Sequence, residues 1–425
     1  MKKSFISVLL ALLLVLSSCV SRNLPREEGT ETENAVSEEG EKTMRKVRNF
    51  ENMKAIWLSQ FDMADVYCKD GKTREQDEYE TLVGRVVADI VSLGFNTVIL
   101  QIRPYGDSFY PSDVYPASRF VVGKYGENFI CDPVAVFVEK AHSSGLSVQA
   151  WINPLRLMTE DEVLLLDPGC VIKKWYVEGR LPCVDNRLYL DPSVEEFRRL
   201  IIDGAAEALE KYDFDGLHID DYFYPTLSPS FDEPSFASSG ETSLEEFRIK
   251  SVDLLVKGLY DAVKSVDSRL VFGVSPSGNL DTLKAKYCAD AEKWCSSEGY
   301  VDYIMPQIYF GLEHSVCPFA ETCEKWRGIV KNENVRLYVG MTLGKAVNGA
   351  KGIEDQYGGS GKREWIENND VMGRCFEFLA SSGVADGVAI FCYQYFYDPV
   401  SGNENGYSAS EAASFLPYLK KDKLS

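Results

Sequence analysis

Hydrophobic and polar positions follow two alternating patterns along most of the chain. Short, nearly continuous apolar runs, rich in β-branched and aromatic residues, alternate with longer stretches in which apolar residues recur every three or four positions. The first pattern is typical of buried strands and the second of amphipathic helices. The predicted strands span residues 54–60, 97–103, 147–153, 216–221, 270–275, 302–309, 336–342 and 387–393. The predicted helices span residues 78–92, 133–144, 194–211, 243–266, 281–296, 319–330, 370–382 and 409–419.

Strands that alternate with helices indicate a parallel sheet, and eight such units predict a closed (β/α)8 TIM barrel in one catalytic domain. The alternative is a doubly wound open sheet, which usually carries a glycine-rich turn after its first strand. Phe61-Asp62-Met63 occupies that position and disfavours this alternative. Residues 155–190 and 225–240 fit neither periodic pattern, and we expect the first, longer segment to be a loop over the active site.

The first residues of the chain predict export. Lys2 and Lys3 precede an apolar run over residues 5–16, which is the pattern of a signal peptide. Leu16-Ser17-Ser18-Cys19 looks like a bacterial lipobox, and this resemblance implies cleavage after residue 18 and lipidation of Cys19. The alternative is an ordinary signal peptide with a chance cysteine. The predicted organisation is therefore a lipoprotein signal peptide (1–18), a flexible acidic tether (19–48) and the barrel (49–425), anchored by lipid in the cell envelope, in the periplasm or at the cell surface.

Charge and composition narrow the choice of partners. The formal net charge of −20 makes nucleic acid a poor partner, because no basic patch is available to neutralise phosphates. Beyond the lipid anchor we expect no membrane contact, since no second apolar run is long enough to cross a bilayer. The three histidines show no zinc-type spacing and the eleven cysteines form no CxxC pair, so neither a metal nor a cofactor is expected. The cysteine spacings assign no disulfide.

Residues 214–225 carry the densest candidate chemistry. Side chains alternate between the two faces of a strand, so Leu217 and Ile219 take one face and His218 and Asp220 the other. Barrel enzymes keep their active sites at the carboxyl ends of the strands, where Asp220 and Asp221 fall. The alternative is that an aspartate after a strand caps the next helix. We predict Asp220 and Asp221 as the catalytic residues.

The carboxyl ends of the other predicted strands bring amides, arginines and aromatic rings to the same mouth. Such groups bind sugar hydroxyls by hydrogen bonds and sugar faces by stacking, which predicts an oligosaccharide or polysaccharide substrate. The predicted substrate-binding residues are Trp57, Arg103, Asn153, Arg156, His218, Tyr224, Ser275, Gln307, Tyr309 and Tyr393. Alternatives remain for several of them, because Arg103 could clamp a loop and Trp57, Tyr309 and Tyr393 could simply fill the barrel.

Five motifs in order resemble those of the glycosyl-hydrolase-like family 10 proteins. The segment 214–225 resembles the family's strand-four motif. The other four are Gln101-Ile-Arg-Pro-Tyr-Gly-Asp107, Ala150-Trp-Ile-Asn-Pro-Leu-Arg156, Gly273-Val-Ser-Pro-Ser-Gly278 and Val301-Asp-Tyr-Ile-Met-Pro-Gln-Ile-Tyr309. The resemblance covers about residues 54–419. It implies a barrel fold and glycoside hydrolase activity, often in an envelope lipoprotein, with some relatives associated with bacterial cell-wall glycan strands.

Other resemblances bear on individual residues. Gly216-Leu-His-Ile-Asp220 is similar to the strand-four motif of the α-amylase superfamily, which implies that Asp220 is the nucleophile. That superfamily keeps a glutamate after strand five, where this chain has Val274-Ser275-Pro276. The segment also resembles the chitinase motif DGxDxDxE, but its final glutamate falls at Tyr222, which disfavours a substrate-assisted mechanism.

Glycoside hydrolysis normally uses two carboxyl groups. We assign Asp220 as nucleophile or base and Asp221 as acid or positioning group, with Asp62, Asp107 and Asp398 in reserve. The leading hypothesis is an envelope-anchored glycoside hydrolase that cleaves a glycan such as peptidoglycan strands. The alternatives are a non-catalytic carbohydrate-binding barrel and, disfavoured by the few histidines, a metal-dependent hydrolase.

Overall fold

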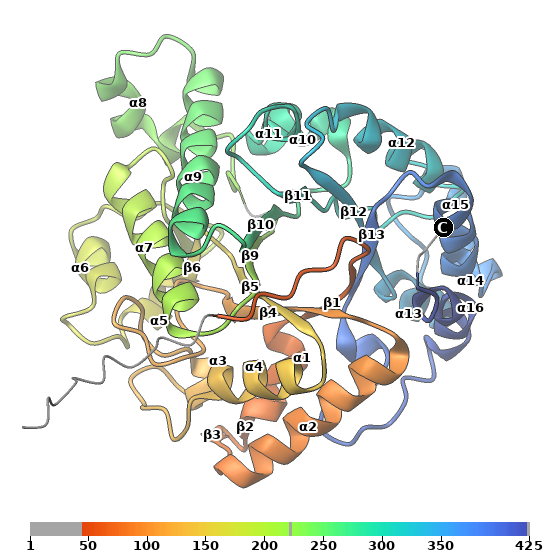
Figure 1. The fold of residues 1–425 in the computed structure, drawn as a ribbon. Helices are drawn as coiled ribbons and strands as arrows, with labels where there is room; N and C mark the ends of the chain where they lie inside the picture. Colours follow the sequence, from red (N-terminus) through yellow and green to blue (C-terminus); the bar gives the residue numbers. More distant parts are fainter. Residues whose placement is uncertain (1–44, 221–222, 423–425) are drawn as a thin grey trace, which may run out of the picture. The chain divides into compact units, whose positions relative to one another are not determined.

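The computed structural model describes residues 45–220 and 223–422, and these residues form one compact unit. Its centre is a closed barrel of eight parallel strands in the order β1-β13-β12-β11-β10-β9-β5-β4 (Figure 1). These strands are β1 Lys54–Leu58, β4 Thr97–Arg103, β5 Ser147–Ile152, β9 Gly216–Ile219, β10 Val271–Val274, β11 Tyr303–Ile304, β12 Arg336–Thr342 and β13 Gly387–Phe391. The predicted (β/α)8 barrel is confirmed.

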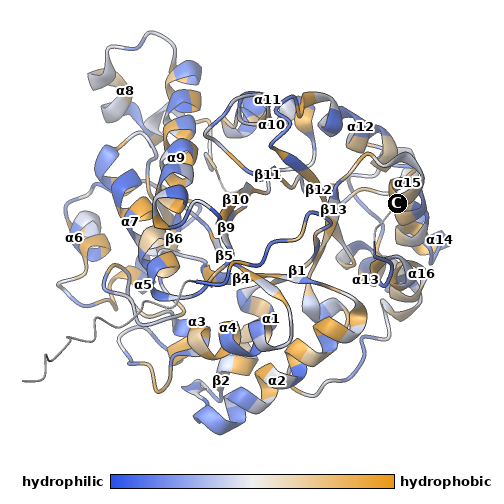
Figure 2. Ribbon diagram, viewed as in Figure 1, coloured by the Kyte–Doolittle hydropathy of each residue, from blue (hydrophilic) through white to orange (hydrophobic). Residues whose placement is uncertain are grey.

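Amphipathic helices surround the barrel. Its principal helices are α2 Gln76–Leu93, α4 Pro133–Ser143, α7 Glu195–Lys211, α9 Leu244–Val266, α10 Leu280–Tyr287, α11 Ala291–Ser296, α12 Phe319–Ile329, α15 Val371–Ser382 and α16 Ala409–Leu419. Many of them carry both hydrophobic and hydrophilic residues in Figure 2, as expected of helices with one buried face. Figure 1 shows them as a ring outside the strands.

Strand alternation divides the core into two parts. Ile56 and Leu58 of β1 pack outward against the helices, whereas Ala55 and Trp57 pack inside the barrel. Tyr303 also fills the inside, and Gly273 on the neighbouring strand makes this possible. A Cβ atom at Gly273 would lie 1.8 Å from the Tyr303 ring, so a side chain there would displace the tyrosine. The interior is therefore packed with side chains, as in other barrels of this kind.

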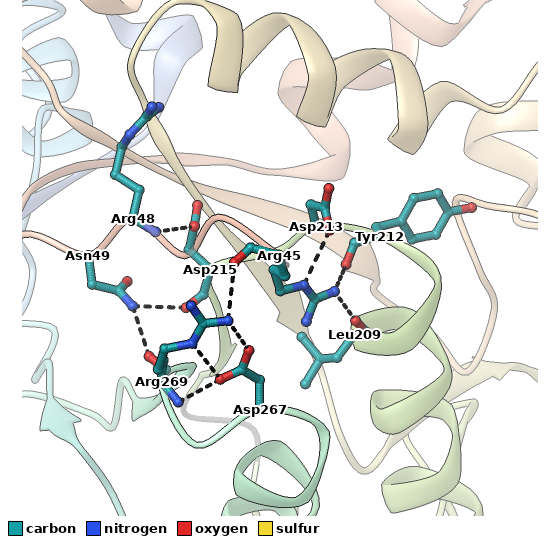
Figure 3. A network of polar contacts seen from close by, with 9 residues as sticks. All are labelled: Arg45, Arg48, Asn49, Leu209, Tyr212, Asp213, Asp215, Asp267 and Arg269. Atoms are coloured by element: carbon teal, nitrogen blue, oxygen red, sulfur yellow. Dashed lines mark hydrogen bonds and ion pairs between the residues drawn. The ribbon is translucent and has the colours of Figure 1, made fainter. Parts of the chain in front are cut away.

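A segment before β1 is bound at the amino ends of the strands. The fully buried Asp215, which precedes β9, accepts hydrogen bonds from the Arg48 and Val148 backbone N–H groups at 2.6 and 2.8 Å. Its carbonyl accepts from Asn49 Nδ2, and Arg269, which precedes β10, donates to the Arg45 carbonyl (Figure 3). Because the amino ends of parallel strands gather at one end of the barrel, residues 45–49 join it at the end opposite the candidate active site.

Three of the differences between the predicted and the observed elements have a clear physical cause. The first strand ends at Leu58, because Ser59 and Asp62 form a capping box that begins α1, Gln60–Tyr67. The strand predicted over 302–309 is reduced to β11, after which Gln307 continues the barrel only through isolated bridges to Ser277 and Gly340. The helix predicted over 281–296 is two helices. Cys288 adopts a left-handed conformation between them, and the Asp290 side chain caps the second.

The long segments between core elements contain short helices and strands. Residues 155–190, predicted as a loop, hold β6 Arg156–Thr159, α5 Glu160–Val163, α6 Val171–Val177, β7 Cys183–Val184 and β8 Arg187–Tyr189, and β6, β8 and β7 form a small antiparallel sheet. Residues 225–240 include a 3-10 turn and α8, Glu233–Ser239. The remaining short elements are β2 Cys68–Lys69, β3 Lys72–Thr73, α3 Arg119–Val122, α13 Gly344–Ala350 and α14 Glu364–Glu367. Periodicity misses them because they are too short to complete a pattern.

The described residues contain no helix long and apolar enough to cross a membrane. Their ten cysteines are all free thiols. Cys19 lies outside the described residues, together with the predicted signal peptide and most of the tether.

A buried glutamate makes stability depend on pH. Glu411 in α16 is almost fully buried and accepts a hydrogen bond from the Met372 backbone N–H at the start of α15. Burial raises the pKa of this carboxyl from 4.5 to about 7. A carboxyl whose pKa is raised by folding favours the folded state below its unfolded pKa, and this contribution is lost as the pH rises to the folded pKa. The loss therefore occurs between about pH 4.5 and pH 7.

Glu411→Gln keeps a hydrogen-bond acceptor and removes the titrating group. We expect the variant to be more stable than the parent at pH 8, by up to about 3 kcal/mol, and to match it more closely at pH 4.5. Urea unfolding at a series of pH values measures this difference. Glu377→Gln, at an exposed position of α15, is the control and should leave the slope unchanged. An identical pH slope for Glu411→Gln and the parent would contradict the assignment.

Candidate active site

A cavity of about 210 Å³ opens at the carboxyl ends of the barrel strands. Its lining residues come from β1, β4, β5, β6 and β13, from the N-cap and first turn of α1, and from the segments that follow β9 and β11. They are Trp57, Ser59, Gln60, Phe61, Gln101, Trp151, Arg156, Asp220, Gln307, Tyr309 and Phe391. Among these described lining residues Asp220 has the one carboxylate, and aromatic rings form a large part of the wall.

Asp220 is held by an amide. Asn153 Nδ2 lies 2.7 Å from both Asp220 carboxylate oxygens. The Asn153 Oδ1 atom in turn accepts a hydrogen bond from Gln101 Nε2 at 2.6 Å. Gln101 Oε1 accepts from the backbone N–H of Gln60, in the first turn of α1, at 2.7 Å. Donors to an ionised carboxylate stabilise its charge, so this row of groups favours a charged Asp220.

His218 lies inside the barrel and does not line the cavity. Its Nε2 faces Trp57 Nε1 at 3.2 Å and its Nδ1 faces Tyr303 Oη at 2.8 Å, while Tyr303 Oη donates to Gln149. The indole N–H can only donate, so His218 Nε2 accepts and the proton sits on Nδ1. Burial lowers the pKa of His218 to about 3, so this imidazole is neutral at physiological pH. It supports the floor of the cavity and fixes the Trp57 ring.

The lining of the cavity combines aromatic rings with an arginine. The Tyr309 and Phe391 rings are stacked with centroids 6.3 Å apart, and the Trp57 ring meets Phe391 edge-on at 6.2 Å. Phe61 from α1 stands at the rim with 63% of its surface exposed. The Arg156 guanidinium lies 4.5 Å from the centroid of the Tyr105 ring. Exposed rings beside polar groups suit a ligand that has apolar faces and hydroxyl edges.

The structure brings together part of the predicted set. Trp57, Arg156, Asp220, Gln307 and Tyr309 all line the cavity. Asn153 lies beside them, but Gln101 occupies its acceptor and Asp220 its donor group, so its position is that of a support for Asp220. The other predicted substrate-binding residues do not line this cavity.

Arg103 is displaced by an irregularity in strand pairing. The register between β4 and β5 shifts between Gln101 and Arg103, so the two side chains do not share a face as strict alternation predicts. The Arg103 guanidinium is buried against helix α7, near the Ile201 carbonyl at 3.5 Å, and lies 4.6 Å from the centroid of the Tyr115 ring. Arg103 therefore packs against α7 and the Tyr115 ring and does not line the cavity.

Three further predicted residues are buried elsewhere. Tyr393 follows the end of β13 and its hydroxyl donates to Asp89 of α2 at 2.7 Å, so it faces the outer helices. Tyr224 packs against Phe231, with the Arg248 guanidinium 5.1 Å from its ring centroid. Ser275 is fully buried. Its carbonyl, rather than its hydroxyl, faces a cavity residue and accepts from Gln307 Nε2 at 3.3 Å.

The second predicted catalytic residue, Asp221, lies outside the described residues. The reserve carboxylates have structural partners. Asp62 accepts from the Ser59 hydroxyl and from the Ser59 and Gln394 N–H groups, and burial raises its pKa. Buried Asp107 accepts from the Tyr105 N–H and the Tyr125 hydroxyl. Asp398 accepts from backbone N–H groups in its own turn. None of the three lines the cavity within the described residues.

The predicted set omitted Ser59, Gln60, Phe61, Gln101, Trp151 and Phe391, all of which line the cavity. Gln101 and Trp151 stand on the inner face of their strands, where alternation places them. Gln60 and Phe61 enter through α1, whose start is signalled by Ser59 and Asp62 three residues apart. The described residues contain no group of three or more His, Cys, Asp or Glu side chains arranged to hold a metal ion.

Comparison with known proteins gives consistent matches. A sequence model of the family described as glycosyl hydrolase-like 10 matches residues 52–358. The chain is 28% identical to glycosyl hydrolase YngK of Bacillus subtilis over 334 residues, which are 72% of this chain and 63% of YngK. It is 29% identical to glycosyl hydrolase DigH of Escherichia coli K12 over 375 residues, 80% of this chain and 82% of DigH. The chain therefore matches less than two thirds of the length of YngK.

The fold is shared with solved structures. The glycoside hydrolase domain of PgaB (BpsB) from Bordetella bronchiseptica superposes with a TM-score of 0.53 and 12% identity, covering 86% of this chain and 98% of that domain. An endo-1,4-beta-mannanase from Rhizomucor miehei has a TM-score of 0.50 at 11% identity, covering 86% of this chain and 95% of that one. At these identities the similarity is one of fold.

Proposed function

Because this chain belongs to the glycosyl hydrolase-like 10 family, we propose that it is a glycoside hydrolase that cleaves a glycan in the cavity at the carboxyl end of its barrel. The family match covers most of the chain and confirms the resemblance carried by the five strand motifs. The relatives it aligns with are themselves named glycosyl hydrolases.

One observation carries the proposal. The buried carboxylate of Asp220 lies in a cavity lined by aromatic rings, amides and the Arg156 guanidinium, and Asn153 donates to both of its oxygens. A fixed, ionised carboxylate beside stacking surfaces is what an oxocarbenium-like transition state requires. Asp220 acts as nucleophile or base in this proposal. The second carboxyl group is Asp221, the next residue in the chain, as acid or positioning group.

The lining supplies the binding interactions. Phe61, Tyr309 and Phe391 are the more exposed rings of the lining and offer surface for sugar stacking, and Gln307 and Arg156 line the same space. Removing water from such a site strengthens the interactions with the developing charge. As the finer proposal, the glycan is a bacterial cell-wall strand, which is the substrate that the family resemblance implies.

The experiment is a survey of glycans. The full chain, in mild detergent, is incubated with peptidoglycan strands freed of peptides, with chitin oligomers and with plant and host polysaccharides, and new reducing ends are counted. The proposal expects release from at least one polymer. Cleavage of cell-wall strands alone supports the finer substrate proposal, whereas cleavage of a different polymer replaces it. No release from any of them contradicts the hydrolase.

A carbohydrate-binding barrel without turnover is the second candidate. It is favoured by the single carboxylate among the described lining residues, since hydrolysis normally uses two. It forecasts binding of a glycan, measured by calorimetry, without release of reducing ends. Binding and turnover in the same sample therefore distinguish the two candidates.

We also propose that the enzyme is lipid-anchored in the cell envelope through Cys19. The expected result for Cys19→Ala is release of the protein from membranes, because a mature chain without the acyl groups has no other predicted anchor. Membrane fractionation after a high-salt wash measures this. Cys68→Ala, which alters a half-buried thiol of the barrel domain, is the control and should remain in the membrane fraction. A Cys19→Ala protein that stays there too would contradict the anchor.

A further inference from the structure

A row of three hydrogen bonds leads from the backbone of α1 to Asp220, and its direction is fixed. The Gln60 backbone N–H can only donate, so Gln101 must present Oε1 to it. Gln101 Nε2 therefore faces Asn153, which accepts through Oδ1. This leaves Asn153 Nδ2 as the donor to Asp220. Neither amide can turn over without placing two acceptors or two donors against each other.

Burial makes this orientation costly to change. The side chains of Gln101, Asn153 and Asp220 are 1%, 0% and 3% exposed. A buried amide or carboxylate that loses its partner cannot recover the hydrogen bond from bulk water. The start of α1 is itself held by the capping box of Ser59 and Asp62, so the Gln60 N–H is a fixed point.

We propose that Gln101 is a positioning residue that acts through Asn153 to keep Asp220 ionised and correctly oriented. The inference rests on the proposed function, in which Asp220 is the nucleophile or base and must be charged to act. Gln101 touches neither Asp220 nor, in this role, the reacting bond. Gln101 acts on Asp220 indirectly, because it fixes which atom of the Asn153 amide faces the Asp220 carboxylate.

Other titratable groups share the surroundings of Asp220. Arg156 from β6 and Tyr309 after β11 line the same cavity. His218 lies beneath on β9, Asp62 lies behind Ser59 in α1, and Asp221 follows in the chain. Substitution of Gln101 leaves all of these groups in place. With the uncharged Gln101→Met variant, a change in the titration of Asp220 is therefore an effect of the hydrogen-bonded row, whereas Gln101→Glu also adds the repulsion of a second negative charge.

Two substitutions of Gln101 make different changes to the row. Gln101→Met removes both hydrogen bonds and leaves Asn153 without its donor. Gln101→Glu still accepts from the Gln60 N–H, but an ionised glutamate cannot donate to Asn153. The Asn153 amide then turns its Nδ2 toward Glu and its Oδ1 toward Asp220, which favours a protonated Asp220. Asn153→Leu removes the direct donor.

The first measurement is the pH dependence of kcat/KM for the full chain, on whichever glycan it cleaves. At low pH kcat/KM falls because Asp220 becomes protonated. A higher pKa of Asp220 therefore moves this acid limb of the pH profile to higher pH. We expect Gln101→Glu and Asn153→Leu to move it upward by about 1 to 2 pH units, the worth of one charge-assisted hydrogen bond. Gln101→Met should move it in the same direction by less.

The control is Gln307→Met. Gln307 is another amide of the cavity, and it donates to the Ser275 carbonyl rather than to Asn153. Replacing Gln307 can lower kcat/KM at every pH, but we expect the acid side of its pH profile to fall at the same pH as in the parent. If the Gln101 variants lose activity or stability with an unshifted acid limb, Gln101 is merely structural and the proposal is overturned.

A second measurement does not depend on activity. The free energy of unfolding is measured against pH for the parent and for Asp220→Asn, and again for the same pair in the Gln101→Glu and Gln101→Met backgrounds. The difference within each pair reports the titration of Asp220. Its folded-state midpoint should be higher in both variant backgrounds than in the parent. An equal midpoint overturns the inference, whereas a shifted midpoint with no glycan cleavage by the parent upholds it and rejects the hydrolase.

Discussion

Asp220→Asn is expected to lower the rate of glycan hydrolysis by roughly a thousandfold, because loss of a catalytic carboxylate costs on the order of 4 kcal/mol of barrier. The substitution keeps the volume of the side chain and one oxygen that can accept from Asn153 Nδ2. It removes the charge that stabilises the transition state. The measurement is kcat and KM on the glycan that the parent cleaves best.

The fold should survive this change, since no cavity is opened. Near-parental circular dichroism and retained glycan affinity are the controls for an intact cavity. A folded Asp220→Asn protein that hydrolyses the glycan at a rate near the parent's would remove Asp220 from the chemistry. If the protein is a binding barrel, the substitution alters affinity alone.

Arg248→Met is expected to lower the free energy of unfolding by about 3 to 5 kcal/mol, the largest stability effect that we predict. Arg248 of α9 donates to both carboxylate oxygens of Asp232, at 2.7 and 2.5 Å, and both side chains are buried. The guanidinium also donates to the Ser228 carbonyl and lies over the Tyr224 ring. Its removal leaves the Asp232 charge buried without this partner. Urea unfolding measures the effect.

Two further variants test whether the loss of stability comes from the buried charge of Asp232. In the double variant Arg248→Met/Asp232→Leu no charge remains buried, so we expect it to recover at least about half of the loss. Arg199→Met breaks the exposed pair with Glu195 and should cost less than about 1 kcal/mol. A loss of that small size for Arg248→Met would show that the pair contributes little. This ion pair also holds the segment that follows Asp220 and Asp221, so kcat should fall with stability.

The parts of the fold and of the site that could be predicted from the sequence are those that depend on the regular spacing of apolar residues along each strand or helix. Alternation along β9 placed Leu217 and Ile219 outward and His218 and Asp220 inward, and the structure agrees. The same rule placed Trp57 inside the barrel at the end of β1. It succeeds because a barrel strand must present one face to the helices and the other to the interior.

The same rule fails where depth or register matters. His218 faces inward but lies a layer below the cavity. Alternation along a strand predicts which face a residue occupies, but it does not predict how far along the barrel axis the residue lies. Arg103 leaves the interior because the pairing of β4 with β5 is irregular, which depends on both strands together. Tyr393 lies beyond the end of β13, where alternation no longer applies.

The partners of polar side chains were the least predictable part. The Asn153 amide is read from sequence as a group for substrate, but the structure shows it between Gln101 and Asp220. Asp62 is a plausible catalytic carboxylate until its partners at Ser59 and Gln394 are known. Apart from Ser59 and Asp62, these pairs join residues tens to hundreds of positions apart, and the pattern of apolar positions contains no record of them.

The central claim is that this barrel adds water across a glycosidic bond, using the carboxylate of Asp220. The most direct test is cleavage of the preferred glycan in water enriched in ¹⁸O, stopped early by borohydride reduction and followed by mass spectrometry of the products. We expect one ¹⁸O atom at each new reducing end from the parent, beyond the exchange seen in preformed reducing ends, and almost no product from Asp220→Asn. Products that contain no added water, or equal labelled product from Asp220→Asn, would contradict it.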